Sequence, residues 1–116
     1  MHLFVNLTTD SAALAAKALR MAGRFAATDW EVTVFLNVDG VRLAAPSDEP
    51  ATCPATGKPL PTMLADLVTK ADVLVGADCL KVASLSPDDL MDGCVPADLD
   101  RVQERLALDG TRVFSY

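Results

Sequence analysis

The sequence has little of what nucleic-acid-binding and membrane proteins require. Its formal net charge is −6, and its 10 lysines and arginines are scattered along the chain. Nucleic acids and anionic membrane surfaces attract basic faces, so we expect neither as a partner. No apolar run reaches the roughly 20 residues that a transmembrane helix needs. Residues 1–5 carry no basic region and no cleavage site, so we expect no signal peptide.

Several motifs that carry chemistry are also absent. The chain has no GxGxxG or GxxxxGK[ST] phosphate-binding loop and no CxxC pair. Its only histidine is His2, which we expect in a frayed N-terminus and not as a catalytic base. A zinc site built from His2, Cys53, Cys79 and Cys94 would need four distant segments to converge, so we expect no bound metal.

The remaining features describe one small domain with a substantial core. Hydrophobic residues make up 51% and charged residues 22% of the 116 positions, which is not the composition of a disordered chain. We expect residues 1–116 to form a single domain that is stable without disulfides. Three cysteines, an odd number, indicate reduced thiols and a cytoplasmic location.

Apolar residues alternate between strand and helix periods along the chain. Strands are predicted at 3–7, 31–38, 73–76 and 111–114, and helices at 11–28, 63–70, 80–85, 86–93 and 99–109. In the last helix, Asp98 is predicted to be the N-cap, and Leu99, Val102 and Leu106 to face inward. The proline-rich segment 46–61 is predicted to be a long irregular loop. Strands that alternate with helices predict an α/β fold with a parallel sheet covered on both faces.

Cys79 is the residue that says most about function, because of its position. It follows the apolar run 73–76 and lies where a short helix begins. In open parallel sheets, ligands and reactive groups collect outside the carboxyl ends of the strands. The helix dipole and Lys81 favour a thiolate at Cys79, while the adjacent Asp78 opposes it. The same position also suits a small buried residue without chemistry.

Three other segments carry candidate groups. Cys94 follows an Asp-Gly pair in a predicted turn, where it is either a second thiol for Cys79 or a packing residue. Cys53 lies on the proline-rich loop, where we expect an exposed and incidental thiol. Residues 8–11 lie between a strand and a helix, a place that can hold a phosphate, but helix capping explains them equally well.

The order of short motifs along the whole chain resembles the DsrE/DsrF-like (TusD-related) family of small sulfur-handling proteins. Segments 73–81 and 86–93 carry the most specific likeness. They resemble the family's strand, cysteine, short helix and acidic-leucine turn ending in glycine. The opening segment 3–10, the segment 57–61 and the ending 110–116 are similar to the same family pattern.

The resemblance implies a three-layer, flavodoxin-like fold with a mainly parallel sheet of about five strands, commonly assembled as trimers or hexamers. It implies that Cys79 carries sulfane sulfur as a persulfide between sulfur-donor and sulfur-acceptor proteins, without a cofactor. Gly76 stands where some members have the first cysteine of a CxxC motif, so a dithiol mechanism within that motif is not expected. Ser84 stands where many members have glycine. Lys58 or Thr8 is expected to line the cleft in which Cys79 lies.

Three hypotheses for function follow. The first is a cytoplasmic sulfur-transfer protein of sulfur oxidation or sulfur relay, with Cys79 as carrier and Lys81 as electrostatic support. The alternative is a non-catalytic, oligomeric binding or regulatory subunit in which Cys79 is structural. The third is a nucleotide or flavin binder that uses residues 8–11.

Overall fold

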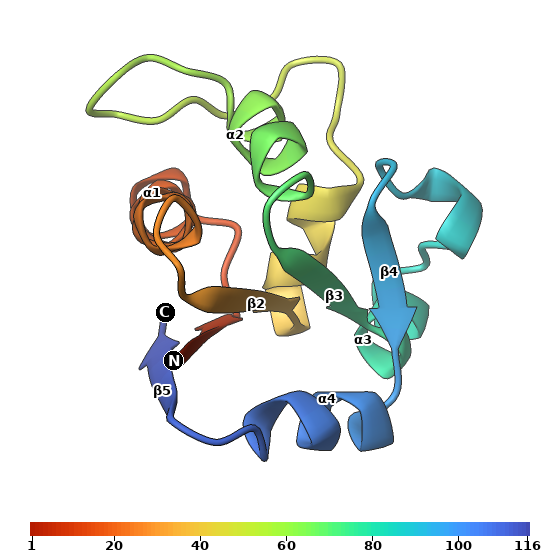
Figure 1. Cartoon of the computed structure of the whole chain (residues 1–116). Helices are drawn as coiled ribbons and strands as arrows, with labels where there is room; N and C mark the ends of the chain where they lie inside the picture. Colours follow the sequence, from red (N-terminus) through yellow and green to blue (C-terminus); the bar gives the residue numbers. More distant parts are fainter.

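A five-stranded sheet, parallel throughout, organises the computed structural model, which describes residues 1–116 (Figure 1). The strand order is β4-β3-β2-β1-β5. This confirms both the α/β class and the five-stranded parallel sheet that the resemblance implies. The strands are β1 (His2–Leu7), β2 (Glu31–Leu36), β3 (Asp72–Gly76), β4 (Cys94–Ala97) and β5 (Thr111–Ser115).

Helices cover the two faces of the sheet unequally. They are α1 (Ala12–Ala26), the 3-10 segment η1 (Val38–Ala44), α2 (Leu60–Leu67), α3 (Ala77–Val82), the 3-10 turn η2 (Pro87–Asp89) and α4 (Leu99–Leu106). α1, α2 and η1 pack on one face, and α4 lies alone on the other (Figure 1). α3 continues directly from the carboxyl end of β3. None of the helices has the length and apolar character to cross a membrane.

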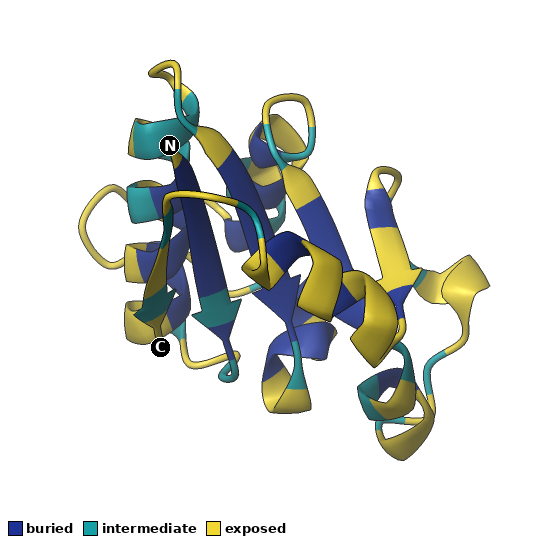
Figure 2. Cartoon of the chain, turned by 60° about the horizontal axis from the view of Figure 1, so that its bottom comes forward, coloured by how far each residue is buried: buried dark blue, intermediate teal, exposed yellow.

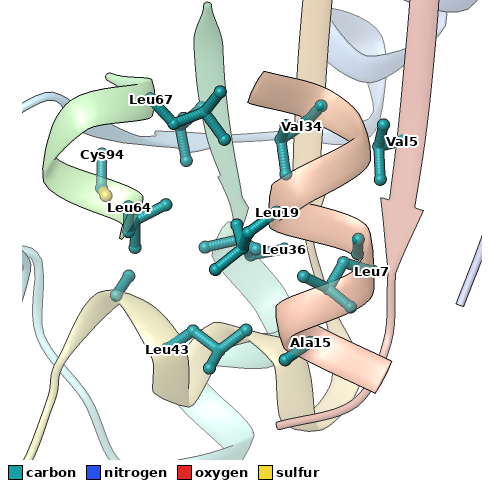
Figure 3. Close-up of a cluster of buried hydrophobic side chains, with 14 of the residues drawn as sticks. Val5, Leu7, Ala15, Leu19, Val34, Leu36, Leu43, Leu64, Leu67 and Cys94 are labelled. Carbon is teal, nitrogen blue, oxygen red and sulfur yellow. The ribbon is translucent and has the colours of Figure 1, made fainter. Parts of the chain in front are cut away.

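The main core lies between the sheet and the layer of α1, α2 and η1. Val5 and Leu7 are alternate residues of β1, and both are fully buried on this side. Figure 3 shows Leu19 of α1 and Leu64 of α2 pointing into the same cluster. Each fully buried leucine contributes about 2 kcal/mol of hydrophobic free energy. This layer therefore supplies most of the apolar burial in the domain.

The opposite face of the sheet carries a smaller core beneath α4. It consists of Phe4, Phe35, Leu74, Ala97 and Val102. The rings of Phe4 and Phe35 are tilted against each other with centroids 6.1 Å apart. An eight-residue helix is about 12 Å long, whereas five strands about 4.8 Å apart span about 19 Å. α4 therefore crosses only part of this face, and its outward side is exposed (Figure 2).

Strand β4 is absent from the sequence prediction, which has a helix at 86–93 and a turn at Cys94. The structure contains only the short turn η2 in that region, closed by a side-chain capping box. Cys94 then opens a strand, opposite Val73 of β3. Pro96 argues against a strand in the sequence, because proline cannot donate a hydrogen bond to a neighbouring strand. β4 lies at the edge of the sheet, where a proline is tolerated.

α4 is capped as predicted, but it buries a different face. The Asp98 carboxylate accepts a hydrogen bond of 2.9 Å from a backbone N–H of the first turn. Val102 faces the sheet, whereas Leu99 and Leu106 are 73% and 42% exposed. The prediction that both leucines face inward is wrong, because Arg105 takes the second inward position.

Arg105 fastens α4 to the amino-terminal edge of the sheet. Its Nε donates to the Thr33 hydroxyl at 3.0 Å, and its Nη2 lies 2.9 Å from a Glu31 oxygen and 3.0 Å from an Asp72 oxygen. The hydrogen bond from Arg105 lowers the pKa of the Glu31 carboxyl. A buried guanidinium is stable here because both of its sides meet acceptors.

His2 belongs to the same network and is only 2% exposed. The Thr111 hydroxyl donates to the Leu108 carbonyl at 2.6 Å, so it accepts from Nδ1–H of His2 at 2.8 Å. The Thr33 hydroxyl accepts from Arg105 and still has its own proton to donate to Nε2 of His2, also at 2.8 Å. This pattern fits a neutral imidazole with its proton on Nδ1, the form that burial favours by lowering the pKa of His2. The expectation of a frayed N-terminus is wrong.

The stability of the protein should depend on the protonation of His2. Burial, and then the charge of Arg105, lower the pKa of His2, while Glu31 and Asp72 oppose them. The folded protein therefore binds this proton less readily than the unfolded chain, whose histidine pKa is about 6.5. The free energy of unfolding should be fully retained above about pH 6.5 and should fall as the pH drops below it.

Urea denaturation at a series of pH values measures this slope, with His2→Gln as the matched control. Glutamine keeps a donor and an acceptor but does not titrate. Because His2 is the only histidine, the variant should show a much smaller slope between about pH 7 and about pH 5.5. Equal slopes in the two proteins would contradict the neutral network.

Candidate functional site

The carboxyl ends of the parallel strands meet at one edge of the sheet, and Cys79 lies there. β3 ends at Gly76 and α3 begins at Ala77, so Cys79 is in the first turn of that helix, as the sequence predicts. Its side chain is partly exposed, whereas Cys53 and Cys94 are buried. Of the three thiols, Cys79 is the one that a reactant in solution can reach.

The backbone of Val38 donates a hydrogen bond to the Cys79 sulfur, with 3.1 Å between N and Sγ. Val38 has φ of 53°, in the left-handed region. For a β-branched residue this conformation costs about 1–2 kcal/mol. The valine is 57% exposed, so its own burial does little to offset the strain. The result of the strained backbone is an N–H group aimed at the sulfur.

The end of β1 holds this strained segment in place. The Asn37 N–H donates to the Leu7 carbonyl at 3.0 Å. The Asn37 side chain donates through Nδ2 to Oδ1 of Asn6 at 2.8 Å. Gly40 lies so close to β1 that a Cβ there would overlap the Leu7 carbonyl oxygen. The Val38 N–H is therefore fixed by contacts on both sides of it along the chain.

Sequence reasoning missed Asn6, Asn37 and Val38. A signal exists for Asn37, because it is the first polar residue after a buried strand and lies at the carboxyl end of that strand. Nothing in the sequence signals the backbone conformation of Val38, since valine is among the residues least expected at positive φ.

Gly76 adjoins the Cys79 sulfur directly. A Cβ built at Gly76 would lie 3.4 Å from Cys79 Sγ and 3.5 Å from the Cβ of Asn37, which are ordinary contact distances. A longer side chain at position 76 would therefore begin its course beside the Cys79 thiol. With glycine there, Cys79 has no partner thiol within its own motif.

The structure does not bring Lys81 to Cys79. The two residues are two positions apart on α3, which places them about 200° apart around the helix axis. Lys81 and Asp78 are both exposed. α3 has 6 residues, so its dipole is that of a short helix. The hydrogen bond from the Val38 N–H is therefore a more specific electrostatic contact to the sulfur than Lys81 or the dipole of α3 provides.

Cys94 lies at the far end of β3 from Cys79. It pairs with Val73, three residues before Gly76, which corresponds to about 10 Å along the strand. Its side chain is 8% exposed and lies in the core cluster with Leu64 (Figure 3). Burial raises the pKa of the Cys94 thiol to about 11. Cys94 is therefore a packing residue of β4 in this structure, and it does not approach Cys79 from a turn.

Cys53 is buried, with 1% exposure, so the expectation of an exposed thiol is wrong. Its loop closes on itself through a bridge between Thr52 and Pro59 and a 2.8 Å hydrogen bond from the Cys53 N–H to the Lys58 carbonyl. A hydrogen bond with the Thr56 side chain, followed by backbone hydrogen bonds, lowers the pKa of the Cys53 thiol. The loop thus folds its cysteine inward.

The Thr8 and Thr9 hydroxyls and the Lys58 side chain make contacts away from Cys79. The Thr8 hydroxyl donates to the Tyr116 carbonyl at 2.8 Å, and the Thr9 hydroxyl accepts from the Ser11 N–H at 3.0 Å. Two of the three hydroxyls of this segment, those of Thr8 and Thr9, therefore already have partners within the protein. Lys58 lies beside α2 and not in the Cys79 cleft. No group of three or more His, Cys, Asp or Glu side chains is arranged to hold a metal ion.

α3 ends in a left-handed residue at Ser84, with φ of 58°. The Leu85 N–H donates to the Leu80 carbonyl at 2.9 Å and closes this helix end. Glycine is the residue best suited to such a conformation. Position 84, where many members of the family that the sequence resembles have glycine, is therefore one where the backbone conformation favours glycine.

Comparisons with known proteins agree with this fold. A family model described as the DsrE/DsrF-like family matches residues 1–116. The chain is similar to the ychN protein from E. coli, with a TM-score of 0.74 and 16% sequence identity over 99% of this chain and 97% of that one. It is also similar to MTH1491, a protein of unknown function from Methanobacterium thermoautotrophicum, with a TM-score of 0.71 and 13% identity over 99% and 97% of the two chains. No curated protein matches the chain.

The three thiols should react at different rates in the native protein. Iodoacetamide should modify Cys79 first, because Cys53 and Cys94 are only 1% and 8% exposed. The buried thiols should react at least about tenfold more slowly, through local unfolding. Peptide mass spectrometry over a time course measures the three rates. Cys79→Ser should lose the fast phase of modification, and Cys53→Ala should keep it. If iodoacetamide modifies Cys79 no faster than Cys94, the described geometry is contradicted.

Proposed function

The chain belongs to the DsrE/DsrF-like family, and from that premise we propose that it is a small cytoplasmic sulfur carrier that holds sulfane sulfur as a persulfide on Cys79. Membership of this family suggests a role related to sulfur relay. The observation that supports the finer proposal is the 3.1 Å contact from the Val38 N–H to the Cys79 sulfur. The partners are a sulfur-donor protein and a sulfur-acceptor protein whose thiols reach this edge of the sheet.

Loading moves one sulfur atom without net oxidation. The Cys79 thiolate attacks the outer sulfur of the donor's persulfide, and the donor's S–S bond breaks. The donor leaves as a thiolate, and the transferred sulfur keeps its proton and is now bonded to Cys79. The Val38 N–H, which points at Sγ, stabilises the thiolate before it attacks.

Delivery is the same exchange in reverse. An acceptor thiolate attacks the outer sulfur, a new persulfide forms on the acceptor, and Cys79 leaves as a thiolate. The hydrogen bond from Val38 again stabilises the negative sulfur. A partly exposed Cys79 allows both partners to approach in line.

Gly76 makes Cys79 a carrier rather than half of a redox pair. A second thiol at position 76 would begin beside the Cys79 sulfur. Its thiolate would attack Cys79 Sγ, expel the outer sulfur as hydrosulfide and leave an internal disulfide. Glycine removes this competing reaction, so the persulfide persists until an acceptor arrives.

Intact-mass spectrometry after treatment with polysulfide tests the carrier. The parent, Cys53→Ala and Cys94→Ala should each gain one sulfur atom, and Cys79→Ser should not. Cyanide should remove the adduct, because it abstracts sulfane sulfur, whereas a sulfinic acid of nearly the same mass would remain. If Cys79→Ser gains cyanide-labile sulfur as readily as the parent, Cys79 is not the carrier.

The same experiment tests the role of Gly76. Gly76→Cys should lose the added sulfur and show an internal disulfide instead, while the matched variant Gly76→Ser should keep the adduct. A Gly76→Cys protein that retains its persulfide as long as Gly76→Ser would contradict the single-thiol account.

We also propose that the chain assembles with copies of itself, as a trimer or hexamer, through the face that carries α4. Val95 and Val113 lie at the two margins of this face, in register with the buried Leu74 and Phe4. Exposed apolar residues at these margins and on α4 favour a protein interface. They form the α4-face patch: Val95, Leu99, Leu106 and Val113, which are 54%, 73%, 42% and 51% exposed.

Sedimentation velocity measures this assembly. The parent should sediment as a species heavier than the 12.3 kDa chain. Leu99→Glu should shift it towards the single chain, because it places a charge in the patch. Leu14→Glu is the matched control, since Leu14 is 50% exposed on α1, outside the patch. A parent that sediments only at 12.3 kDa would rule the assembly out.

The α4-face patch also favours the second candidate function, a non-catalytic oligomeric binding or regulatory subunit. In that function the patch matters and Cys79 is a structural residue. An assembled parent that gains no cyanide-labile sulfur would support this alternative, and assembly together with sulfur on Cys79 would support the carrier.

A further inference from the structure

A cavity of about 620 Å³ lies between α1, α2 and the loop at 56–58. Small-molecule sites have volumes of about 300–1,000 Å³, so the cavity has the size of a ligand site. α1 and α2 run side by side on one face of the sheet (Figure 1). None of the residues that line the cavity belongs to α3 or η1, so it is separate from the Cys79 site.

A glycine of α1 faces the open space of the cavity. Gly23 lines it, and a Cβ built there meets nothing within 4 Å. Glycine is unfavourable in a helix interior. Leu19 lies one turn before Gly23 on the same side of α1, and α2 contributes Met63 and Leu67. The cavity therefore combines open space with an apolar wall.

Positive charge reaches the cavity from three separate elements. Arg20 comes from α1, Lys58 from the loop and Lys70 from the turn after α2, and Asp66 is the only carboxylate in the lining. Three cations and one carboxylate give the lining a charge of +2, in a chain whose net charge is −6. This local reversal of sign attracts an anion.

Most of this charge is available for a ligand. Arg20 and Lys70 form no salt bridge. Lys58 lies 3.6 Å from Asp66, but their side chains are 50% and 67% exposed. Such an exposed pair is weak and can open at little cost.

We propose that this cavity binds a small organic phosphate. The apolar body of the ligand lies against Leu19, Met63 and Leu67, and the phosphate lies among the three cations. A phosphate dianion suits a cavity lined by three cations better than a ligand with a single negative charge does. The apolar wall should give such a ligand a higher affinity than inorganic phosphate, because inorganic phosphate has no apolar group to bury.

Phenyl phosphate is the probe, and inorganic phosphate and phenol are its matched controls. Titration of the ¹⁵N-labelled protein, followed by NMR, should show saturable binding of one phenyl phosphate per chain, with shifts at Gly23, Gly57 and Lys70. Inorganic phosphate and phenol should each bind at least about tenfold more weakly, because each lacks one of the two contacts.

Substitutions test the position of the ligand. Gly23→Leu should weaken phenyl phosphate binding at least about tenfold by filling the cavity, and its thermal midpoint should not fall, because leucine favours a helix. Arg20→Gln and Lys70→Gln should each weaken it about tenfold. Lys17→Gln on the same helix should leave the affinity unchanged, and so should Cys79→Ser, which separates this site from the sulfur carrier.

Four results would overturn the proposal. They are the absence of saturable phenyl phosphate binding, equal affinity for inorganic phosphate, parent-like affinity in a folded Gly23→Leu, and an equal loss of affinity in Lys17→Gln and Lys70→Gln.

Discussion

Parallel pairing places Leu36 of β2 opposite Val75 of β3, and the candidate sulfur site depends on that register. Asn37 and Val38, which follow β2, then lie beside Gly76, the last residue of β3. Cys79 turns back toward them in the first turn of α3, so its sulfur meets the Val38 N–H. A slip of one residue would turn the buried faces outward. The apolar alternation that stabilises the core therefore also positions the sulfur.

The carboxyl and amino ends of the strands carry different kinds of structure. The carboxyl edge holds a strained backbone at Val38 beside a partly exposed thiol. The amino edge holds a fully hydrogen-bonded network in which His2 and Arg105 tie α4 to the sheet. Strain at one site persists when the surrounding structure over-determines it. The contacts of Asn37 and Gly40 with β1 hold the unfavourable valine conformation where it serves the proposed chemistry.

The sequence predicts the features that arise locally and misses those that depend on distant partners. The apolar runs and the position of Cys79 between strand and helix follow from short-range periodicity. The His2 network does not, because its hydroxyl partners lie 31 and 109 residues away. β4 is short and contains Pro96, so neither its length nor its composition predicts a strand. The burial of Cys53 arises from hydrogen bonds within its own loop, which composition alone cannot indicate.

The most direct test of the account is the amide resonance of Val38 in ¹⁵N-labelled protein, recorded before and after Cys79 is loaded with sulfane sulfur. If the Val38 N–H stabilises the anionic sulfur, its proton should resonate downfield in the free thiolate form. It should then move upfield on loading, as charge leaves Sγ. Cys79→Ser should show neither change. A Val38 amide that does not respond while Cys79 gains and loses sulfur would contradict the central claim.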